Sequence, residues 1–338
     1  MGDSKTITES FVSVDGFEVY DIAKMMIDRL NNPEPLLCSH DLEGIGTNSL
    51  RQLSDSKAGP RLRLSASGSC VRQLAYSWHM FDSTEKFNAA SRMIFSVGDL
   101  TESVMVALIR EVFASVGECE LLYTGDDQSS VNVEVPLGNG RTLNVSGHPD
   151  GLMVLPMWTS DAFGFTDTHT STDSKLRAIL EVKSMSDYGF KKFRKEGMTT
   201  DNSYYGQIQA YMMARTQMDG EPCEYAYIVA WGKTSGAKDA EFLDKDKTSW
   251  RMVPPIHGQW VKADPEYQRQ LVEKFRAIAL SNSPEDFDRP YGPGKKGKLG
   301  FPCSYCSYMK NCFPDVVERA DSSFWRAYAT KLHPFIKE

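Results

Sequence analysis

The sequence predicts an α/β fold in which a central mixed sheet is flanked by helices. Short apolar segments of strand type lie at 151–154, 179–183 and 224–231. Segments rich in helix-forming residues lie between and after them, at 204–214 and 265–280. With 338 residues, of which 41% are hydrophobic and 25% charged, the chain is long enough for one large domain or two modest ones.

The strand predicted at 179–183 carries two charged residues inside an apolar run. Successive side chains of a strand alternate between its faces, so Glu181 and Lys183 point to one side while Leu180 and Val182 pack into the core on the other. A solvent-facing strand with a cross-strand ion pair is the alternative explanation.

Asp150 directly precedes the apolar segment 151–154, which we expect to be a neighbouring strand that brings this carboxylate close to Glu181. Carboxylate oxygens are ligands for Mg²⁺ or Mn²⁺ rather than for zinc. Upstream, the apolar run Val104–Ile109 predicts a buried helix, and Glu102 just before it is a third candidate carboxylate.

The helix predicted at 204–214 places Gln207 and Tyr211 four residues apart on one face. Both side chains can hydrogen-bond a phosphate or a metal-bound water. A half-buried helix with no functional part explains the same pair, so this alternative stays open.

In chain order, the motifs Gly-x-x-x-Glu, Gly-x-Pro-Asp, Glu-x-Lys and Gln-x-x-x-Tyr resemble those of the RecB-like branch of the PD-(D/E)XK nuclease superfamily. The match covers roughly residues 65–315. The resemblance implies a restriction-endonuclease-like core in which Asp150 and Glu181 bind the catalytic metal, and Lys183 activates or orients the attacking water. It also implies that Gln207 and Tyr211 support the site.

Many members of this family have a His ligand where this chain has Thr101, and Glu102 is the natural substitute here. By this resemblance, one or two Mg²⁺ or Mn²⁺ ions would be held by Glu102, Asp150, Glu181 and the carbonyl of Val182.

Three cysteines, Cys303, Cys306 and Cys312, lie within ten residues of one another. Two cysteines separated by two residues can both face one metal centre, and the third arrives from the following turn. Cys70 is the best candidate for a fourth ligand. Unliganded cysteines and a disulfide scheme are weaker explanations, because packing does not require such a cluster and a total of seven cysteines does not pair off.

One early cysteine followed by a late Cys-x₂-Cys-x₅-Cys is similar to the iron–sulfur staple of AddB helicase–nuclease subunits and of CRISPR-adaptation Cas exonucleases. The resemblance implies a [4Fe–4S] cluster. A structural Zn²⁺ site is the alternative, since spacing alone does not separate the two. Either metal would make a cysteine-cluster clip that joins the N- and C-terminal parts of the domain.

The net charge of −7 and the pI near 5.5 argue against a uniformly positive surface, so any DNA contact must be local. Two basic clusters are candidates for it, although a solvated charged loop explains either one equally well. They are Lys191, Lys192, Arg194 and Lys195, and then Lys295, Lys296 and Lys298. Nearby aromatic residues such as Tyr188 and Tyr204 are candidates for stacking on unpaired bases.

We divide the chain into an N-terminal extension (1–64) with a helix near Val19–Leu30, a nuclease domain with the cysteine clip (65–315) and a C-terminal helix (316–338). Within the nuclease domain, the Thr-, Ser- and Asp-rich segment Pro156–Lys175 predicts a surface loop.

Together with the site residues, the family resemblance implies a metal-dependent deoxyribonuclease, an exonuclease rather than an endonuclease, acting in DNA recombination, repair or phage DNA metabolism. The expected partner is DNA with a single-stranded end. A helicase or recombination protein is a further expected partner, because the sequence lacks the phosphate-binding loop of a helicase. Without an apolar run of about 18 residues or a signal sequence, we expect a cytoplasmic protein that does not enter membranes.

Two alternatives from other classes stay open. The chain could be a DNA-binding or recombination-partner module whose nuclease site has decayed and whose four cysteines hold a structural metal. It could also be a zinc-stapled scaffold in which the acidic residues only pair with lysines.

Overall fold

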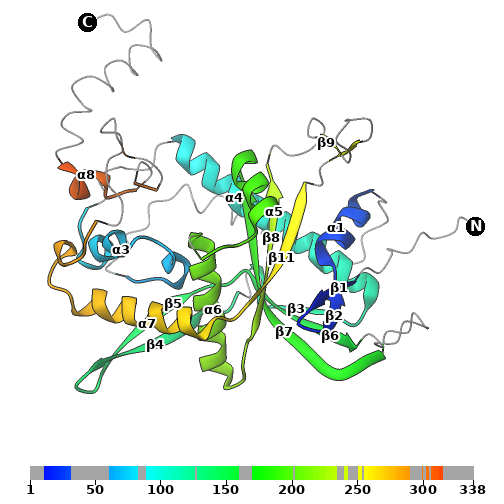
Figure 1. Ribbon diagram of the computed structural model, residues 1–338, viewed down its shortest axis with the longest axis horizontal. Coiled ribbons are helices and arrows are strands. Elements are labelled where there is room, and N and C mark those ends of the chain that lie inside the picture. Colours follow the sequence, from blue (N-terminus) through cyan, green and yellow to red (C-terminus); the bar gives the residue numbers. More distant parts are fainter. Residues whose placement is uncertain are drawn as a thin grey trace, which may run out of the picture.

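The predicted α/β architecture is confirmed, with a central mixed sheet and helices on both of its faces (Figure 1). The structure is a computed structural model, described here over residues 11–31, 61–82, 89–125, 128–159, 170–200, 202–233, 240–242, 250–252, 255–289, 299, 302–303 and 306–314.

The strands are β1 (Phe11–Val14), β2 (Phe17–Tyr20), β3 (Glu120–Leu122), β4 (Val131–Gly138), β5 (Arg141–Gly147), β6 (Gly151–Thr159), β7 (Thr170–Met185), β8 (Tyr225–Gly232), β9 (Ala240–Phe242), β10 (Trp250–Met252) and β11 (Ile256–Lys262). The helices are α1 (Ile22–Asn31), α3 (Val71–Trp78), α4 (Ala89–Val116), α5 (Asp187–Glu196), α6 (Ser203–Asp219), α7 (Pro265–Leu280) and α8 (Met309–Cys312), with short 3₁₀ helices at Leu64–Ala66 and Pro284–Asp286.

The main sheet has the strand order β1-β2-β6-β7-β8-β11, and β3 pairs with β6 beside this path. Strands β7 and β8 are parallel, while the other paired neighbours are antiparallel. A parallel pair needs a crossover connection, which α5 and α6 supply between β7 and β8. The chain therefore passes from the Glu-x-Lys strand directly into the two helices that cover it.

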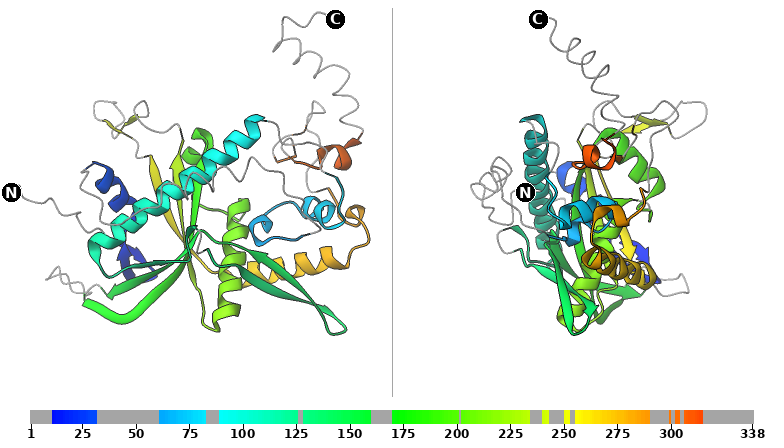
Figure 2. Two further views of the ribbon diagram at one scale, coloured as in Figure 1. Left: turned by 180° about the vertical axis from the view of Figure 1, so that it is seen from behind. Right: turned by 90° about the vertical axis from the view of Figure 1, so that its left-hand side faces the viewer.

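The helices form layers on the two faces of this sheet. Helices α1 and α4 pack on one face, and Figure 2 shows α4 lying diagonally across it. Helices α5 and α6 pack on the other face, and α6 is covered in turn by α7 and the β4–β5 hairpin. Because α6 is enclosed by protein on several sides, every residue from Gly206 to Arg215 is buried.

Helix α6 is fixed at both ends and along its length. The Asn202 side chain accepts the backbone N–H of Tyr204 at 3.0 Å, and Gly220 ends the helix with a left-handed φ of 71°. At Gly206, an added Cβ would lie 2.7 Å from the Cα of Gly68. This glycine pair allows the loop before α3 to contact the helix backbone directly.

The sheet curls so strongly that its first hairpin reaches its last strands. Asp15, in the β1–β2 turn, accepts the Tyr225 hydroxyl of β8 at 2.7 Å and forms an ion pair with Lys262 of β11. The side chains of Val19 and Met25 belong to the same buried cluster as residues of α4 and β7. Residues 11–31 are therefore part of the main core.

Two expectations about secondary structure differ from what is observed. The predicted loop Pro156–Lys175 is wrong at both ends, because β6 continues to Thr159 and β7 already begins at Thr170 as its antiparallel partner. The helix expected from Val19 begins only at Ile22, because Val19 and Tyr20 belong to β2 and pair with Val12 and Phe11 of β1. The C-terminal helix at 316–338 lies outside the described residues.

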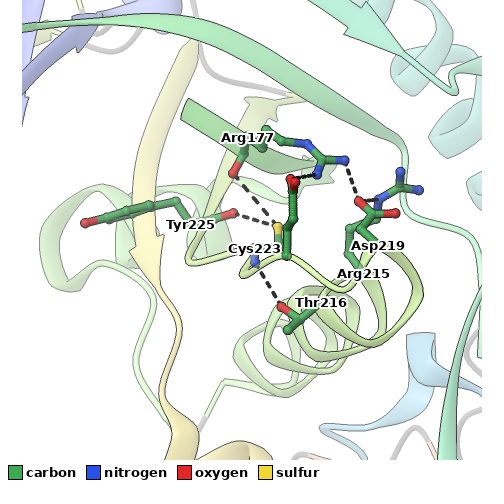
Figure 3. Close-up of polar contacts among 7 residues, drawn as sticks. Arg177, Arg215, Thr216, Asp219, Cys223 and Tyr225 are labelled. Atoms are coloured by element: carbon green, nitrogen blue, oxygen red, sulfur yellow. Dashed lines mark hydrogen bonds and ion pairs between the residues drawn. The ribbon is translucent and has the colours of Figure 1, made fainter. Parts of the chain in front are cut away.

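Cys223 is held in the tight connection between α6 and β8 (Figure 3). Its thiol lies 3.9 Å from the carbonyl oxygen of Arg177 and 3.7 Å from that of Tyr225, and its N–H donates to the Thr216 hydroxyl at 2.9 Å. The Arg177 side chain is anchored beside it by an ion pair with Asp219. Burial raises the pKa of Cys223 to about 11, and this thiol lies apart from the four cysteines that line the pocket between α3 and α8.

None of the helices within the described ranges is long and apolar enough to span a membrane.

Candidate active site

The predicted pairing of the Asp150 and Glu181 strands is confirmed. Strand β6 is the antiparallel neighbour of β7, with Gly151 opposite Leu180, so Asp150 comes next to Glu181. The Asp150 carboxylate accepts the backbone N–H of Val182 at 2.7 Å. This hydrogen bond directs one carboxylate oxygen onto the β7 backbone beside Glu181.

The alternation predicted for 179–183 is also observed. Leu180 and Val182 lie in the cluster under α1 and α4, while Glu181 points toward α6. One Glu181 oxygen, Oε1, accepts the Gln207 side-chain amide at 2.7 Å and is ion-paired with Lys183. The two-residue spacing of the strand thus places Glu181 and Lys183 together, as expected.

Glu102 of α4 lies within hydrogen-bonding reach of Asp150, which makes it the third carboxylate of the site. The neighbouring Thr101 is buried, and its hydroxyl donates to the Val97 carbonyl of its own helix at 2.7 Å. Thr101, at the position of the family's His, is thus bonded within its own helix, while Glu102 lies next to Asp150.

The pKa values of the acidic groups are raised because these groups lie close together and away from water. Burial and then the charges of Asp150 and Glu181 raise the pKa of Glu102 to about 9. Burial and Asp150 raise the pKa of Glu181 to about 8. Burial alone would lower the pKa of Lys183, but Glu181 and Asp150 outweigh it and raise that pKa. The site is a buried cluster of acids held around one ammonium group.

The turn before Asp150 is held by two side chains from distant segments. The Tyr211 hydroxyl of α6 donates to the His148 carbonyl at 3.0 Å, and the Gln128 amide donates to the Pro149 carbonyl at 2.8 Å. The His148 side chain itself is exposed. Tyr211 therefore holds the backbone of the Gly-x-Pro-Asp turn, which carries Asp150, in place.

Gln207 and Tyr211 are linked to each other, with the Gln207 amide 3.4 Å from the Tyr211 hydroxyl. Both are buried, and their spacing of four residues places them on the face of α6 that meets β7. The predicted pair thus connects Glu181 to the turn that carries Asp150.

Two residues beyond the predicted catalytic set lie near the site, and one of them, Tyr204, is among the aromatic residues expected to stack on bases. The ring of Tyr204 lies 5.1 Å from the Lys183 ammonium, a cation–π distance. Asp99 of α4 contributes to raising the pKa of both Glu102 and Asp150, so its charge lies near theirs. Asp99 lies three residues before Glu102, and this i,i+3 spacing was the only sequence signal for it.

Within the described part of the chain, no group of three or more His, Cys, Asp or Glu side chains has an arrangement that could hold a metal ion. The carboxylate site nevertheless suits a hard cation in its chemistry. Glu181 is 1% exposed, and its second oxygen, Oε2, is buried with no hydrogen-bond partner. An orphaned carboxylate oxygen beside two other acids is a donor set for Mg²⁺ or Mn²⁺.

The four predicted cluster cysteines line one small pocket between α3 and α8. All four are free thiols. Burial and the neighbouring thiols raise the pKa of Cys303 to about 11. The turns that carry the late cysteines are joined by a hydrogen bond from the Cys306 N–H to the Cys303 carbonyl at 3.1 Å. The lining thiols are Cys70, Cys303, Cys306 and Cys312.

Cationic side chains surround this pocket. Arg72 and Arg289 line it, and their charges oppose the burial that raises the pKa of Cys312. Lys274 of α7 donates to the carbonyls of Ser67 and Ser69 at 2.7 and 2.6 Å, which fixes the loop before Cys70. Four thiols beside positive charges are a donor set that suits an anionic Cys₄ metal centre, either iron–sulfur or zinc.

The first basic cluster lies on α5, directly after β7. Lys191, Lys192 and Lys195 are exposed, and Tyr188 on the same helix is 80% exposed. Two of these lysines make i,i+4 ion pairs, Lys191 with Asp187 at 3.1 Å and Lys192 with Glu196 at 3.8 Å. The second cluster, Lys295, Lys296 and Lys298, lies outside the described residues.

No protein-family model and no curated protein matches the chain. Solved structures that align with it include the crystal structure of SSO0001, at 12% identity and a TM-score of 0.41, covering 80% of this chain and 95% of that one. An alkaline exonuclease from Laribacter hongkongensis, LHK-Exo, aligns at 14% identity and a TM-score of 0.35, over 70% of this chain and 90% of that one. The complex of LHK-Exo with dAMP aligns at 13% identity and a TM-score of 0.35, over 65% and 86%. At these TM-scores the alignments assign neither a family nor an activity to the chain.

Proposed function

We propose that the protein is a metal-dependent DNA nuclease of the RecB-like PD-(D/E)XK type. The observation that carries this proposal is the convergence of Glu102, Asp150 and Glu181 with Lys183, two buried acids, one half-buried acid and one ammonium from α4, β6 and β7. A buried acid cluster costs folding stability, and such costs are typical of functional sites.

In this proposal, the carboxylates of Glu102, Asp150 and Glu181 and the carbonyl of Val182 would hold Mg²⁺ or Mn²⁺. A bound ion of this kind lowers the pKa of a coordinated water and neutralises charge on a phosphate. The orphaned Oε2 of Glu181 supports this ligand set.

The protein groups have distinct parts in the proposed site. Lys183 orients the attacking water and stabilises negative charge on the phosphate, because its ammonium is held at Glu181 and remains protonated. Gln207 fixes the Glu181 carboxylate, and Tyr211 fixes the turn before Asp150. These two act as positioning residues.

We further propose that the four-cysteine pocket holds a structural metal centre, a [4Fe–4S] cluster or Zn²⁺. A centre bound by Cys70 and by Cys303, Cys306 and Cys312 would tie α3 to the region around α8. Its part is to stabilise the domain, because the pocket is lined by none of the proposed catalytic residues.

The proposed substrate is DNA with a single-stranded end, cut as an exonuclease does. The exposed lysines and Tyr188 of α5 support this choice, because cations with an exposed aromatic ring bind unpaired strands. Recombination, repair or phage DNA metabolism with a helicase or recombination partner, and a cytoplasmic location, belong to the same proposal.

A digestion series tests the proposed activity. End-labelled single- and double-stranded DNA is incubated with Mg²⁺, Mn²⁺ or EDTA, using wild type, Glu181→Ala, Lys183→Ala and the exposed control Glu273→Gln. We expect cleavage by wild type and control only with a divalent ion, and a loss of at least 100-fold in both site variants. Equal digestion by wild type and both site variants would contradict the proposal. DNA binding without cutting would favour a decayed, DNA-binding module.

A further inference from the structure

A cavity of about 760 Å³ lies where the curled sheet brings its two edge strands, β1 and β11, near each other. Helix α1, which Figure 1 shows beside β11, forms part of its wall. Arg194 of α5 also lines it. Its volume is that of pockets that take small-molecule or cofactor-sized ligands. None of the carboxylates of the proposed cleavage site lines it, so it is a separate site.

Aromatic side chains form part of the wall in fixed positions. The rings of Tyr227 and Trp260 lie 4.9 Å apart between centroids. The Tyr227 hydroxyl accepts the Ala23 N–H at 3.1 Å, and the Tyr225 hydroxyl donates to Asp15 at 2.7 Å. Tyr225 and Tyr227 are buried, and Tyr227 packs against the partly exposed ring of Trp260, so a planar ligand would pack on Trp260, whose position is already fixed.

The indole N–H of Trp260 is buried and has no hydrogen-bond partner. An indole nitrogen can only donate, and a buried donor left without an acceptor is both rare and costly. A ligand with a ring nitrogen, a carbonyl or a phosphate oxygen at this point would satisfy it.

The charges around the cavity favour an anionic ligand. The cations Lys24, Arg194 and Lys262 outnumber the carboxylates Asp15 and Asp21. Lys262 is paired with Asp15, and Lys24 is paired with Asp28 at 2.8 Å, so Arg194 is the lining cation that we assign to a phosphate. An aromatic ring and a guanidinium in one cavity match a ligand that combines a base with a phosphate.

The cavity lies one short step along the sheet from the proposed cleavage site. Lys183, Ala230 and His257 are opposite one another on β7, β8 and β11, and His257 lines the cavity. Two strand spacings separate Lys183 from His257 by about 10 Å. A short single strand can reach across a separation of this size.

We propose that this cavity is a second nucleotide-binding site, which takes a base against Trp260 and a phosphate near Arg194. The proposal rests on the proposed function in one respect, that the nucleotide belongs to a single-stranded DNA substrate. A free nucleoside monophosphate has the same chemistry, and the experiment separates the two sources.

Binding is measured in EDTA, so that metal-dependent cleavage plays no part. The probes are fluorescently labelled (dT)₁₂, followed by anisotropy, and dTMP, followed by calorimetry. Trp260→Phe keeps an aromatic ring and removes the indole N–H, and Arg194→Gln removes the cation; both are also combined. Arg276→Gln on the exposed surface of α7 is the matched control.

We expect the double variant to bind at least one probe about tenfold more weakly, and the control to bind like wild type. Arg194→Gln should also reduce the slope of log affinity against log salt concentration for (dT)₁₂ by about one, because one phosphate contact is lost. A loss confined to (dT)₁₂ identifies a nucleotide within a strand, and a loss for dTMP identifies a free nucleotide.

Wild-type affinity of the double variant for both probes, or a wild-type protein that binds neither, would overturn the proposal. If the Trp260 variants melt at a lower temperature than wild type, Arg194→Gln alone decides the outcome. Since binding is read without metal, a protein that binds these probes but cuts no DNA would contradict only the proposed nuclease activity.

Discussion

The substitution Glu102→Gln should stabilise the metal-free protein, although it removes a side chain from the centre of the candidate site. Burial and the neighbouring carboxylates raise the pKa of Glu102 from 4.5 to about 9. At pH 7.5 the folded protein therefore keeps this group protonated, while in the unfolded chain it is ionised. Glutamine has nearly the same shape and needs no proton.

The magnitude follows from the size of the shift. Between pH 4.5 and pH 7.5, three units at about 1.36 kcal/mol each give a ceiling of ~4 kcal/mol. Water penetration and relaxation reduce such ceilings, so we expect a gain of about 2 kcal/mol, or about 4 °C in Tm. Because the folded pKa is raised, wild-type stability is lost as pH rises from 4.5 toward 9, and the advantage of Glu102→Gln grows over the same range.

The assay is urea unfolding in EDTA at several pH values between 5 and 8.5. Glu273→Gln, an exposed glutamate of α7, is the control and should change stability by less than about 0.5 kcal/mol. Addition of Mg²⁺ should stabilise wild type more than Glu102→Gln, because the variant lacks one proposed ligand. A destabilised Glu102→Gln, or a difference that does not change with pH, would refute the crowded-acid description of the site.

Three further predictions concern packing, the cysteine pocket and pH. Gly206→Ala should lower the free energy of unfolding in urea by about 2 kcal/mol, because its Cβ would lie 2.7 Å from the backbone of Gly68. The control Gly98→Ala, whose Cβ would have its nearest contact at 3.8 Å, should leave this free energy unchanged or raise it by up to about 1 kcal/mol. Cys306→Ala should lower bound iron or zinc, measured by elemental analysis, and lower the Tm, and unchanged values of both would argue against a metal clip. Burial lowers the pKa of His257, so wild-type stability should fall as pH drops below about 6.5, where the unfolded chain takes up the proton; His257→Gln should flatten this dependence, and equal slopes would contradict it.

The parts of the site that could be predicted from the sequence are those set by the two-residue repeat of a strand or the four-residue spacing of a helix. The two-residue period at 179–183 correctly placed Glu181 and Lys183 on one face, and the four-residue spacing placed Gln207 and Tyr211 together on α6. Asp150 was correctly expected beside Glu181, because it ends a turn that leads into the adjacent strand.

What could not be predicted depends on contacts between distant segments. Gln128 reaches the turn before Asp150 from a loop with no motif of its own. The place of residues 11–31 in the main core was missed, although Asp15-Gly16 between alternating residues is a hairpin signal, and both have positive φ. The extent of β7 was missed because its first residues, 170–175, are mostly polar residues of loop type, and that of β6 because Pro156 interrupts its apolar run.

The most direct test of the central claim is to locate a bound ion. Crystals of the protein soaked in MnCl₂ can be measured at a wavelength where manganese scatters anomalously. We expect an anomalous peak within about 2.3 Å of carboxylate oxygens of both Asp150 and Glu181. A well-ordered site with no peak there at saturating MnCl₂, or a peak only elsewhere on the protein, would contradict the claim that these acids form a divalent metal site.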